Sequence, residues 1–331
     1  MGSWRPATIN LVAARAGVSR ATVSRVMNGK SSVAPELAAR VHAAASALQY
    51  RPSIVARGLA GGRTSTVALV VPDLANPLFQ GILRSLGQAA GRASHRLLVA
   101  ESNEDVAAEI EMAREARRRC DALVLCAPRM SAEVLAELAP ELEPLVLLNR
   151  AVPEVRSPQV AVDYAAGIRD LVTHLEGLGH SRLAYLSGPA TSASHTLRLQ
   201  ALHELASAGR IQLDVLPCGP SFADGHAAAG AARESGSSAV VAYNDLVALG
   251  VLSGLHELGA RVPEQMSVVG FDDIPFSAYS TPTLTTAAVP TDEIGEHAWA
   301  RVCALLDGSP VPADLRLRPR IVVRGSTAPA P

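Results

Sequence analysis

The chain contains few cysteines, few aromatic residues and almost no lysine. Its 331 residues include four cysteines, two tryptophans, five tyrosines and four phenylalanines, and among its 30 basic side chains only Lys30 is a lysine. The cysteines are far apart and form no CxxC pair, which argues against a zinc site or a disulfide framework and favours a reducing compartment. The preference for arginine, together with abundant alanine, is typical of a GC-rich genome.

Long apolar runs are also absent. No stretch approaches the roughly 18 apolar residues of a membrane span, and the N-terminal residues 1–6 lack the apolar core of a secretion signal. We therefore expect a cytoplasmic protein with no membrane partner. The histidines and cysteines show no metal-ligand spacing and no nucleophile-elbow pattern is found, so we expect no metal, no other cofactor and no catalytic site.

The net charge of −1 hides an asymmetry along the chain. Residues 1–60 carry eight basic side chains and one acidic side chain, a net charge of +7, whereas residues 61–331 carry 22 basic and 30 acidic side chains, a net charge of −8. A basic segment joined to an acidic body indicates a domain that binds a polyanion, attached to a body with a different task.

The first fifty residues show the pattern of three short helices. Thr8 can cap a helix with apolar residues at 9, 12, 13 and 16, and Gly17 suits its left-handed end. Ser19 can cap a second helix, and Pro35 suits the first turn of a third. Two helices joined by a glycine turn, the second with a basic outer face, form the helix-turn-helix pattern of DNA-binding domains. A plain three-helix bundle with a solvated basic face fits the same spacing.

A series of short stretches in this region carries a family resemblance. These are Thr8-Ile9, Val12-Ala13, Ala16-Gly17-Val18-Ser19, Ala21-Thr22-Val23-Ser24-Arg25-Val26-Met27-Asn28-Gly29, Val33, Arg40-Val41, Leu48, Tyr50-Arg51-Pro52 and Ala56-Arg57-Gly58-Leu59. Together they closely resemble the headpiece of the LacI/GalR (lactose/galactose repressor) family. The resemblance implies a second helix in the major groove of operator DNA and a hinge helix over residues 53–60, with Leu59 wedged into the minor groove. The DNA contacts implied by position are Ser19, Arg20, Ala21, Thr22, Ser24, Arg25, Asn28, Tyr50, Arg57 and Leu59.

Three positions depart from the family pattern. Leu11 stands where the family usually has Asp, Ala34 replaces the usual Ser cap of the third helix, and Leu37-Ala38 replaces a Thr-Arg pair. Losing a helix cap typically costs about 1 kcal/mol. The changes affect the expected phosphate contacts and leave the family resemblance intact.

From residue 66 onward, short apolar runs alternate with helical patterns. Strands are predicted at 67–71, 97–100, 122–125, 145–148, 160–162, 183–186, 239–242 and 267–270, and helices at 77–93, 105–118, 165–176, 197–208, 227–234 and 246–257. Apolar strands between helices indicate an α/β fold with parallel sheets covered on both faces. The pattern is too long for one small doubly wound domain, so we predict two lobes, with a ligand beyond the carboxyl ends of the strands.

Polar side chains follow several of these predicted strands. They are Asp73, Asn76, Asn149, Arg150, Asp163, Asn244, Asp245, Asp272 and Asp273. Each can simply cap a helix, but their joint placement at strand ends favours a pocket. Carboxylates, amides and an arginine suit a polyhydroxylated ligand, because sugar hydroxyls both donate and accept hydrogen bonds.

The body resembles the same family over nearly its whole length. The matching stretches include Leu178-Gly179-His180, Leu186-Ser187-Gly188-Pro189, Ala242-Tyr243-Asn244-Asp245, Ser267-Val268-Val269-Gly270-Phe271-Asp272-Asp273, Pro282-Thr283-Leu284-Thr285-Thr286 and Arg324-Gly325-Ser326-Thr327. The resemblance implies a periplasmic-binding-protein-like core of two lobes joined by several crossings, with an effector in the cleft. By matched position, the strongest expected effector contacts are Arg198, Asn244 and Asp272. The others are Asn76, Phe79, Asn149, Arg150, Asp163 and Phe222, the last on a loop shorter than is usual in the family.

These observations predict a DNA-binding transcriptional repressor controlled by a small effector, a sugar or sugar derivative. We expect a helix-turn-helix headpiece at residues 1–50, a hinge at 51–62 and an effector-binding, dimerising core at 63–331. The expected partners are palindromic operator DNA, a carbohydrate effector and a second copy of the chain. Residues 328–331 end the chain without a heptad pattern, so we expect a dimer without a tetramerising coil.

Three alternatives stay open at this point. A regulator of the same family that depends on a co-repressor or on a protein partner fits the sequence as well. A solute-binding transport protein shares the core fold but has no use for the headpiece. An enzyme on this fold would use Asp245 or Asp272 as a base, and chemical turnover of the bound ligand would identify it.

Overall fold

A computed structural model of the chain describes residues 7–27, 33–50 and 64–331. The chain divides into two compact units, Met1–Thr64 and Ser65–Pro331. The expected hinge lies outside the described residues, and so do the expected DNA contacts Asn28, Arg57 and Leu59.

The described part of the first unit, residues 7–27 and 33–50, contains three helices around one small apolar core. They are α1 (Ile9–Ala16), α2 (Arg20–Met27) and α3 (Pro35–Ala47). The Thr8 hydroxyl caps α1 by accepting from the N–H of Leu11, and Gly17 ends α1 with a left-handed φ of +63°. Most of the apolar residues that the spacing assigns to the interior are buried, namely Val12, Ala13, Ala16, Val23, Val26, Val41 and Ala44. The others are partly buried, namely Ile9, Met27, Leu37 and Leu48. The α3 helix begins without a side-chain cap, because Ala34 has no hydroxyl.

The second unit contains two six-stranded sheets, one in each of two lobes. The first-lobe sheet has the strand order β11-β5-β4-β3-β1-β2, and the second-lobe sheet has the order β12-β10-β9-β8-β6-β7. The strands are β1 (Thr66–Val71), β2 (Arg96–Glu101), β3 (Ala122–Cys126), β4 (Leu145–Leu148), β5 (Gln159–Val162), β6 (Arg182–Leu186), β7 (Gln212–Leu216), β8 (Ala239–Ala242), β9 (Ser267–Asp272), β10 (Thr285–Ala288), β11 (Leu315–Leu317) and β12 (Arg320–Val322). Within these described strands every neighbouring pair is parallel except β10 and β12.

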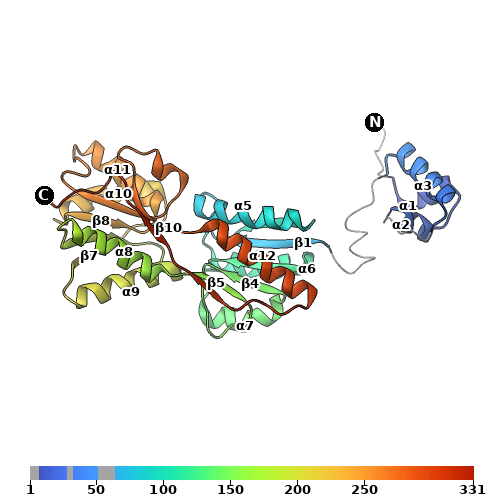
Figure 1. Cartoon of the computed structure of the whole chain (residues 1–331), viewed down its shortest axis with the longest axis horizontal. Helices are drawn as coiled ribbons and strands as arrows, with labels where there is room; N and C mark the ends of the chain where they lie inside the picture. The colour runs from blue at the N-terminus through green and yellow to red at the C-terminus, as the bar shows by residue number, and fades with distance from the viewer. Residues whose placement is uncertain (1–6, 28–32, 51–63) are drawn as a thin grey trace. The chain divides into compact units, whose positions relative to one another are not determined.

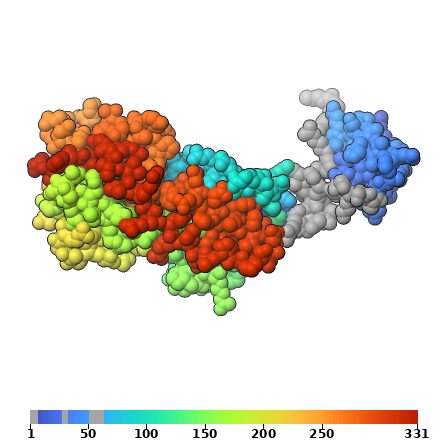
Figure 2. All heavy atoms as spheres, viewed as in Figure 1, coloured from blue at the N-terminus to red at the C-terminus, as the bar shows by residue number. Residues whose placement is uncertain are grey.

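Helices cover both faces of each sheet, as the apolar strands predict. In the first lobe, α5 (Pro77–Arg92) and α12 (Thr291–Asp307) lie side by side on one face, and α6 (Val106–Arg119) and α7 (Ala132–Leu142) cover the other (Figure 1). In the second lobe, α8 (Tyr164–Gly177) and α9 (Ala193–Ser207) cover one face, and α10 (Phe222–Glu234) and α11 (Asp245–Glu257) cover the other. Figure 2 shows α12 packed along α5 although some 200 residues separate them in sequence.

The chain passes between the lobes three times. It crosses after β5, again after β10, and a third time between β11 and β12. The strand predicted at residues 160–162 therefore belongs to the first sheet, which an apolar pattern alone does not reveal. The orders β2-β1-β3-β4-β5 and β7-β6-β8-β9-β10 are both doubly wound, so each sheet has a switch point where ligands bind beyond the carboxyl ends of the strands. No helix in the described ranges is long and apolar enough to cross a membrane.

Candidate functional site

A small cavity, here called the inner cavity, lies between the two lobes at the carboxyl ends of the strands. It encloses about 20 Å³ of free space, which is room for roughly one water molecule. The first lobe lines it with Asp73, Asn76, Leu78, Phe79, Glu104, Ala127, Arg129 and Asn149, and the second lobe with Tyr164, Ser194, Arg198, Pro220, Tyr243, Asn244 and Asp272. The two sheets thus place carboxylates, amides, guanidinium groups and aromatic rings around one point.

Arg198 is the central cation of this cavity. Its side chain is 2% exposed, and its Cζ lies 4.3 Å from the ring centre of Tyr164, 4.8 Å from that of Tyr243 and 4.1 Å from that of Phe271. Cation–π contacts of this kind gain strength when they are desolvated. Gly188 allows the close approach of Tyr243, because a Cβ there would meet the tyrosine ring at 2.4 Å.

Asp272 lies opposite Arg198, and the pKa of its buried carboxyl is shifted. The Arg198 Nη2 lies 3.6 Å from Asp272 Oδ1, and both side chains are buried. Burial raises the pKa of the Asp272 carboxyl well above its usual range; Arg198 opposes this shift and Asp245 adds to it. Four buried side-chain polar atoms of the described residues have no hydrogen-bond partner, and two of them are Arg198 Nε and Asp272 Oδ1. A buried polar atom without a hydrogen-bond partner costs free energy. Such an atom indicates that its partner is supplied by a group outside the described chain.

The backbone around the cavity is also strained. Non-glycine residues with left-handed φ follow three strands of the first lobe, and they are Asn103 and Glu104 after β2, Ala127 after β3 and Asn149 after β4. In the second lobe, Asp272 at the end of β9 has φ +117° and Asp273 has φ +59°. Such conformations cost of order 1–3 kcal/mol each and gather at functional sites.

Six of the nine expected effector contacts line the inner cavity. They are Asn76, Phe79, Asn149, Arg198, Asn244 and Asp272. The helix-cap interpretation also holds for the amides, because Asn76 accepts from Leu78 N–H at 2.9 Å and Asn244 accepts from Val247 N–H at 2.8 Å. One side chain can therefore position a helix and face the cavity at the same time.

Three expected contacts do not line the inner cavity, and their role as effector contacts stays a prediction. Asp163 caps α8 by accepting from Ala166 N–H at 3.0 Å. Arg150 donates from Nη1 to the carbonyls of Pro128 and Met130, which fixes it to the first lobe outside the cavity. Phe222 begins α10 and is 45% exposed. A capping box formed by Ser221 and Asp224 fixes the start of this helix.

Several lining residues escape sequence reasoning. Arg129 is held by Glu104, with Nε–Oε2 at 2.5 Å and Nη2–Oε1 at 2.8 Å, and by the Ala127 carbonyl at 3.0 Å. This pair spans 25 residues, so no local pattern predicts it. Tyr164 and Tyr243 each stand next to a predicted residue, and their position within two residues of a strand end is the signal that points to them.

Asp245, one candidate base of the enzyme alternative, lies in the interior of the second lobe away from the cavity. Its carboxylate accepts from Thr286 Oγ1 at 2.6 Å, Ser277 Oγ at 2.7 Å and Ile274 N–H at 2.9 Å. Burial raises the pKa of Asp245 to about 6, although these three hydrogen bonds lower it. The residue joins α11, β10 and the 3₁₀ turn Pro275–Ala278.

The Asp245 carboxyl predicts a pH dependence of core stability. Its folded-state pKa of about 6 exceeds the ordinary 3.8, so the folded chain binds a proton that the unfolded chain releases. The contribution is present below the ordinary pKa and is lost as pH rises through about 6. Urea unfolding followed by circular dichroism between about pH 4 and pH 7 should show a falling free energy of unfolding, and a smaller fall in Asp245→Ala. The exposed Asp292→Ala is the control; an unchanged slope in Asp245→Ala would contradict the assignment.

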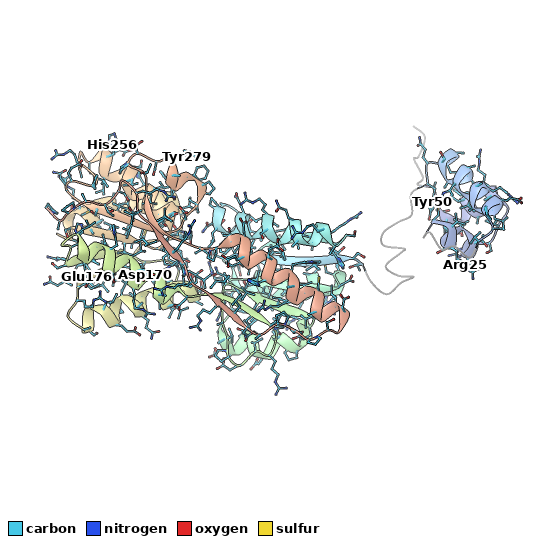
Figure 3. The ribbon with its side chains drawn as sticks, viewed as in Figure 1. Arg25, Tyr50, Asp170, Glu176, His256 and Tyr279 are labelled. Atoms are coloured by element: carbon cyan, nitrogen blue, oxygen red, sulfur yellow. The ribbon has the colours of Figure 1, made fainter. Side chains whose placement is uncertain are left out.

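Three of the expected DNA-binding residues are exposed on α2. Arg20, Ala21 and Arg25 are exposed, and Figure 3 shows Arg25 projecting from the surface of the first unit. Ser19 caps the helix, because its Oγ accepts from Thr22 N–H at 3.1 Å and lies 2.9 Å from Thr22 Oγ1. Thr22 and Ser24 are half-buried, and Tyr50 packs partly against the core of this unit. The basic side chains therefore remain the accessible groups of this face.

Comparison with known proteins gives one consistent result. Residues 8–53 match the model of bacterial regulatory proteins of the lacI family, and residues 172–327 match a periplasmic binding protein-like domain. The HTH-type transcriptional regulator GalR of Escherichia coli is 35% identical over 314 residues, covering 92% of this chain and 91% of GalR.

Two solved structures show the same architecture. The lac repressor dimer bound to operator and the anti-inducer ONPF superposes with a TM-score of 0.86 at 28% identity, covering 98% of this chain and all of the repressor chain. The complex of the transcriptional regulator CelR with cellobiose has a TM-score of 0.71 at 30% identity, covering 97% of this chain and all of CelR. The chain belongs to the LacI family of bacterial DNA-binding transcriptional regulators.

Proposed function

We propose that the inner cavity is the centre of an effector site, and that a polyhydroxylated small molecule bound there controls how tightly the headpiece holds operator DNA. One observation carries the proposal: Arg198 Nε and Asp272 Oδ1 are buried at the lobe boundary without hydrogen-bond partners. A hydroxyl group can accept from the first and donate to the second, so a sugar hydroxyl satisfies both atoms.

The rest of the lining supports a carbohydrate. Amide groups of Asn76, Asn149 and Asn244 stand near the aromatic rings of Phe79 and Tyr164. Binding sites for small molecules combine apolar walls with a few fixed polar groups in this way. The structural relative CelR was solved with cellobiose, which is consistent with a sugar in this type of core.

The small size of the inner cavity supports a mechanism that involves lobe movement. About 20 Å³ cannot admit a sugar ring, so the lobes must separate for binding, and the three crossings can act as hinges. An effector that binds one lobe arrangement better shifts the population toward it by its difference in affinity. We propose that this shift changes the spacing of two headpieces on a palindromic operator in the cytoplasm.

A second copy of the chain would supply the second headpiece. The core leaves large apolar side chains exposed on both lobes: Leu98 and Val99 on β2 are 40% and 36% exposed, and Phe276 and Tyr279 near the 3₁₀ turn are 59% and 86% exposed. Figure 3 shows Tyr279 projecting from the second lobe. Two-fold pairing that covers such patches is the commonest oligomeric arrangement.

The hydrogen bonding of Asp245 favours regulation over catalysis. All three of its donors come from its own lobe and it does not line the inner cavity. A general base must lie within hydrogen-bond reach of the ligand proton, and Asp245 does not. Asp245 is thereby excluded as the base, and we propose that Asp272, which lines the cavity, accepts from the ligand without converting it.

Asp272→Asn tests the proposed function. The variant keeps the shape of the side chain but removes the carboxylate that would accept a ligand hydroxyl. We expect sugars or nucleosides that raise the melting temperature of the wild-type chain to leave Asp272→Asn unchanged. Operator affinity without ligand should stay within about twofold of wild type, since a distant substitution changes binding only through coupling.

The readout is fluorescence anisotropy with an operator selected from a randomised DNA pool, with exposed Asp292→Asn as the matched control. An undiminished effector response in Asp272→Asn would place the site elsewhere. The sign of the wild-type response separates an inducer, which weakens operator binding, from a co-repressor, which strengthens it.

A further inference from the structure

A second and larger hollow, here called the outer groove, lies at the same boundary between the lobes. It encloses about 600 Å³, within the roughly 300–1,000 Å³ of sites for small molecules. The first lobe contributes the loops after β3 and β4, including Met130, Arg150 and Val152, and the second lobe contributes the start of α9, including Thr196 and Leu197. A ligand in this groove would touch both lobes at once.

The inner cavity and the outer groove share a wall. Arg129 lines both, and the adjacent α9 residues Ala193 and Ser194 line the groove and the cavity respectively. Glu104 holds the Arg129 guanidinium through two hydrogen bonds of 2.5 and 2.8 Å. Arg129 therefore forms part of the wall between the inner cavity and the outer groove.

The groove has an apolar floor and a polar rim. Leu197, which is 42% exposed, and the exposed Ala151 and Pro153 supply apolar surface, whereas Met130 and Val152 are almost fully buried. Arg150, fixed by the carbonyls of Pro128 and Met130, supplies a cation at the wall, and Thr196 adds a hydroxyl. A sugar ring presents carbon–hydrogen faces and a rim of hydroxyls, which match these two kinds of surface.

We propose that the two compartments form one site and that the effector is a disaccharide, with one ring at Arg198 and Asp272 and the second ring in the outer groove. The inference rests on the proposed function and names its ligand class. Two rings held by both lobes would couple ligand binding to lobe position more strongly than one ring in the inner cavity, because each lobe then contributes separate contacts.

Thr196→Trp tests the inference by filling the groove from an exposed position on α9. Gln200→Trp is the matched control, since it lies one turn further along the same helix, is also exposed and does not line the groove. Isothermal titration calorimetry compares cellobiose, maltose and lactose with glucose, galactose and ribose. We expect wild type and Gln200→Trp to bind one disaccharide at least about tenfold more tightly than its monosaccharides, and Thr196→Trp to lose that preference.

The other outcomes distinguish failure of the disaccharide inference from failure of the proposed sugar effector. If a monosaccharide binds as tightly as any disaccharide and Thr196→Trp leaves both affinities unchanged, the disaccharide inference is overturned and the proposed function stands. If Thr196→Trp slows association and dissociation equally and leaves Kd unchanged, the groove is only an entrance and the inference is again overturned. If none of the six sugars binds wild type, the sugar effector itself is overturned and the inference with it.

Discussion

Replacing Arg198 by methionine is expected to weaken effector binding at least about tenfold, because the hydrogen bond that its charged Nε would donate to the ligand is lost, at about 1.5–3 kcal/mol. Methionine can fill the space between the rings of Tyr164, Tyr243 and Phe271, since it is long, flexible and apolar. Loss of the guanidinium also removes the group that opposes the raised pKa of Asp272. Isothermal titration calorimetry with the effector measures the affinity.

Two controls separate recognition from folding. Arg198→Lys keeps the charge but not the planar donors, so it should recover only part of the affinity. Arg210→Met removes an exposed arginine paired with Glu176 and should leave affinity unchanged. Full effector affinity in a folded Arg198→Met chain would exclude Arg198 as a contact and with it the inner cavity as the site.

Arg25→Ala is expected to weaken operator binding by about 1–3 kcal/mol, roughly 5- to 150-fold, and to relax base preference at one position in each half of the operator. The arginine is exposed on α2, where a guanidinium can bond guanine O6 and N7 with two donors. Titration of labelled operator variants, one base pair changed at a time, measures both the loss and the position.

The same assay needs a control for the effect of losing one positive charge. Arg15→Ala removes one exposed cation from α1 in the same unit, and it should weaken operator and random DNA by similar small factors. Equal losses on operator and random DNA in Arg25→Ala would mean that Arg25 contacts phosphate and reads no base.

Local signals predict much of this fold because they act within a few residues. Thr8 and Gly17 mark the ends of α1 as expected, and every predicted strand is present. The predictions omit α7, β7, β10, α12, β11 and β12. The α7 helix carries Pro140 in its interior, β10 is the polar run Thr285–Ala288, and β11 and β12 have three residues each. The helices α9 and α10 begin four and five residues before their predicted starts at 197 and 227.

The candidate site, like the fold, is only partly predicted by local sequence signals. Strand-end position and family resemblance lead to Asn76, Asn149, Asn244 and Asp272, which line the inner cavity. Long-range pairing decides the others: Arg129 depends on Glu104, and Arg150 is held by carbonyls about twenty residues earlier. No periodicity encodes such contacts, because they arise only when the loops after three different strands meet.

The central claim is that a molecule bound between the lobes controls the affinity for operator DNA. Its most direct test is to measure effector affinity with and without saturating operator. Linkage requires that operator changes effector affinity by the same factor by which effector changes operator affinity. The account predicts a factor of roughly 5 to 150 in both measurements, lost together in Asp272→Asn. Identical effector affinity with and without operator, for a ligand that binds the inner cavity, would contradict it.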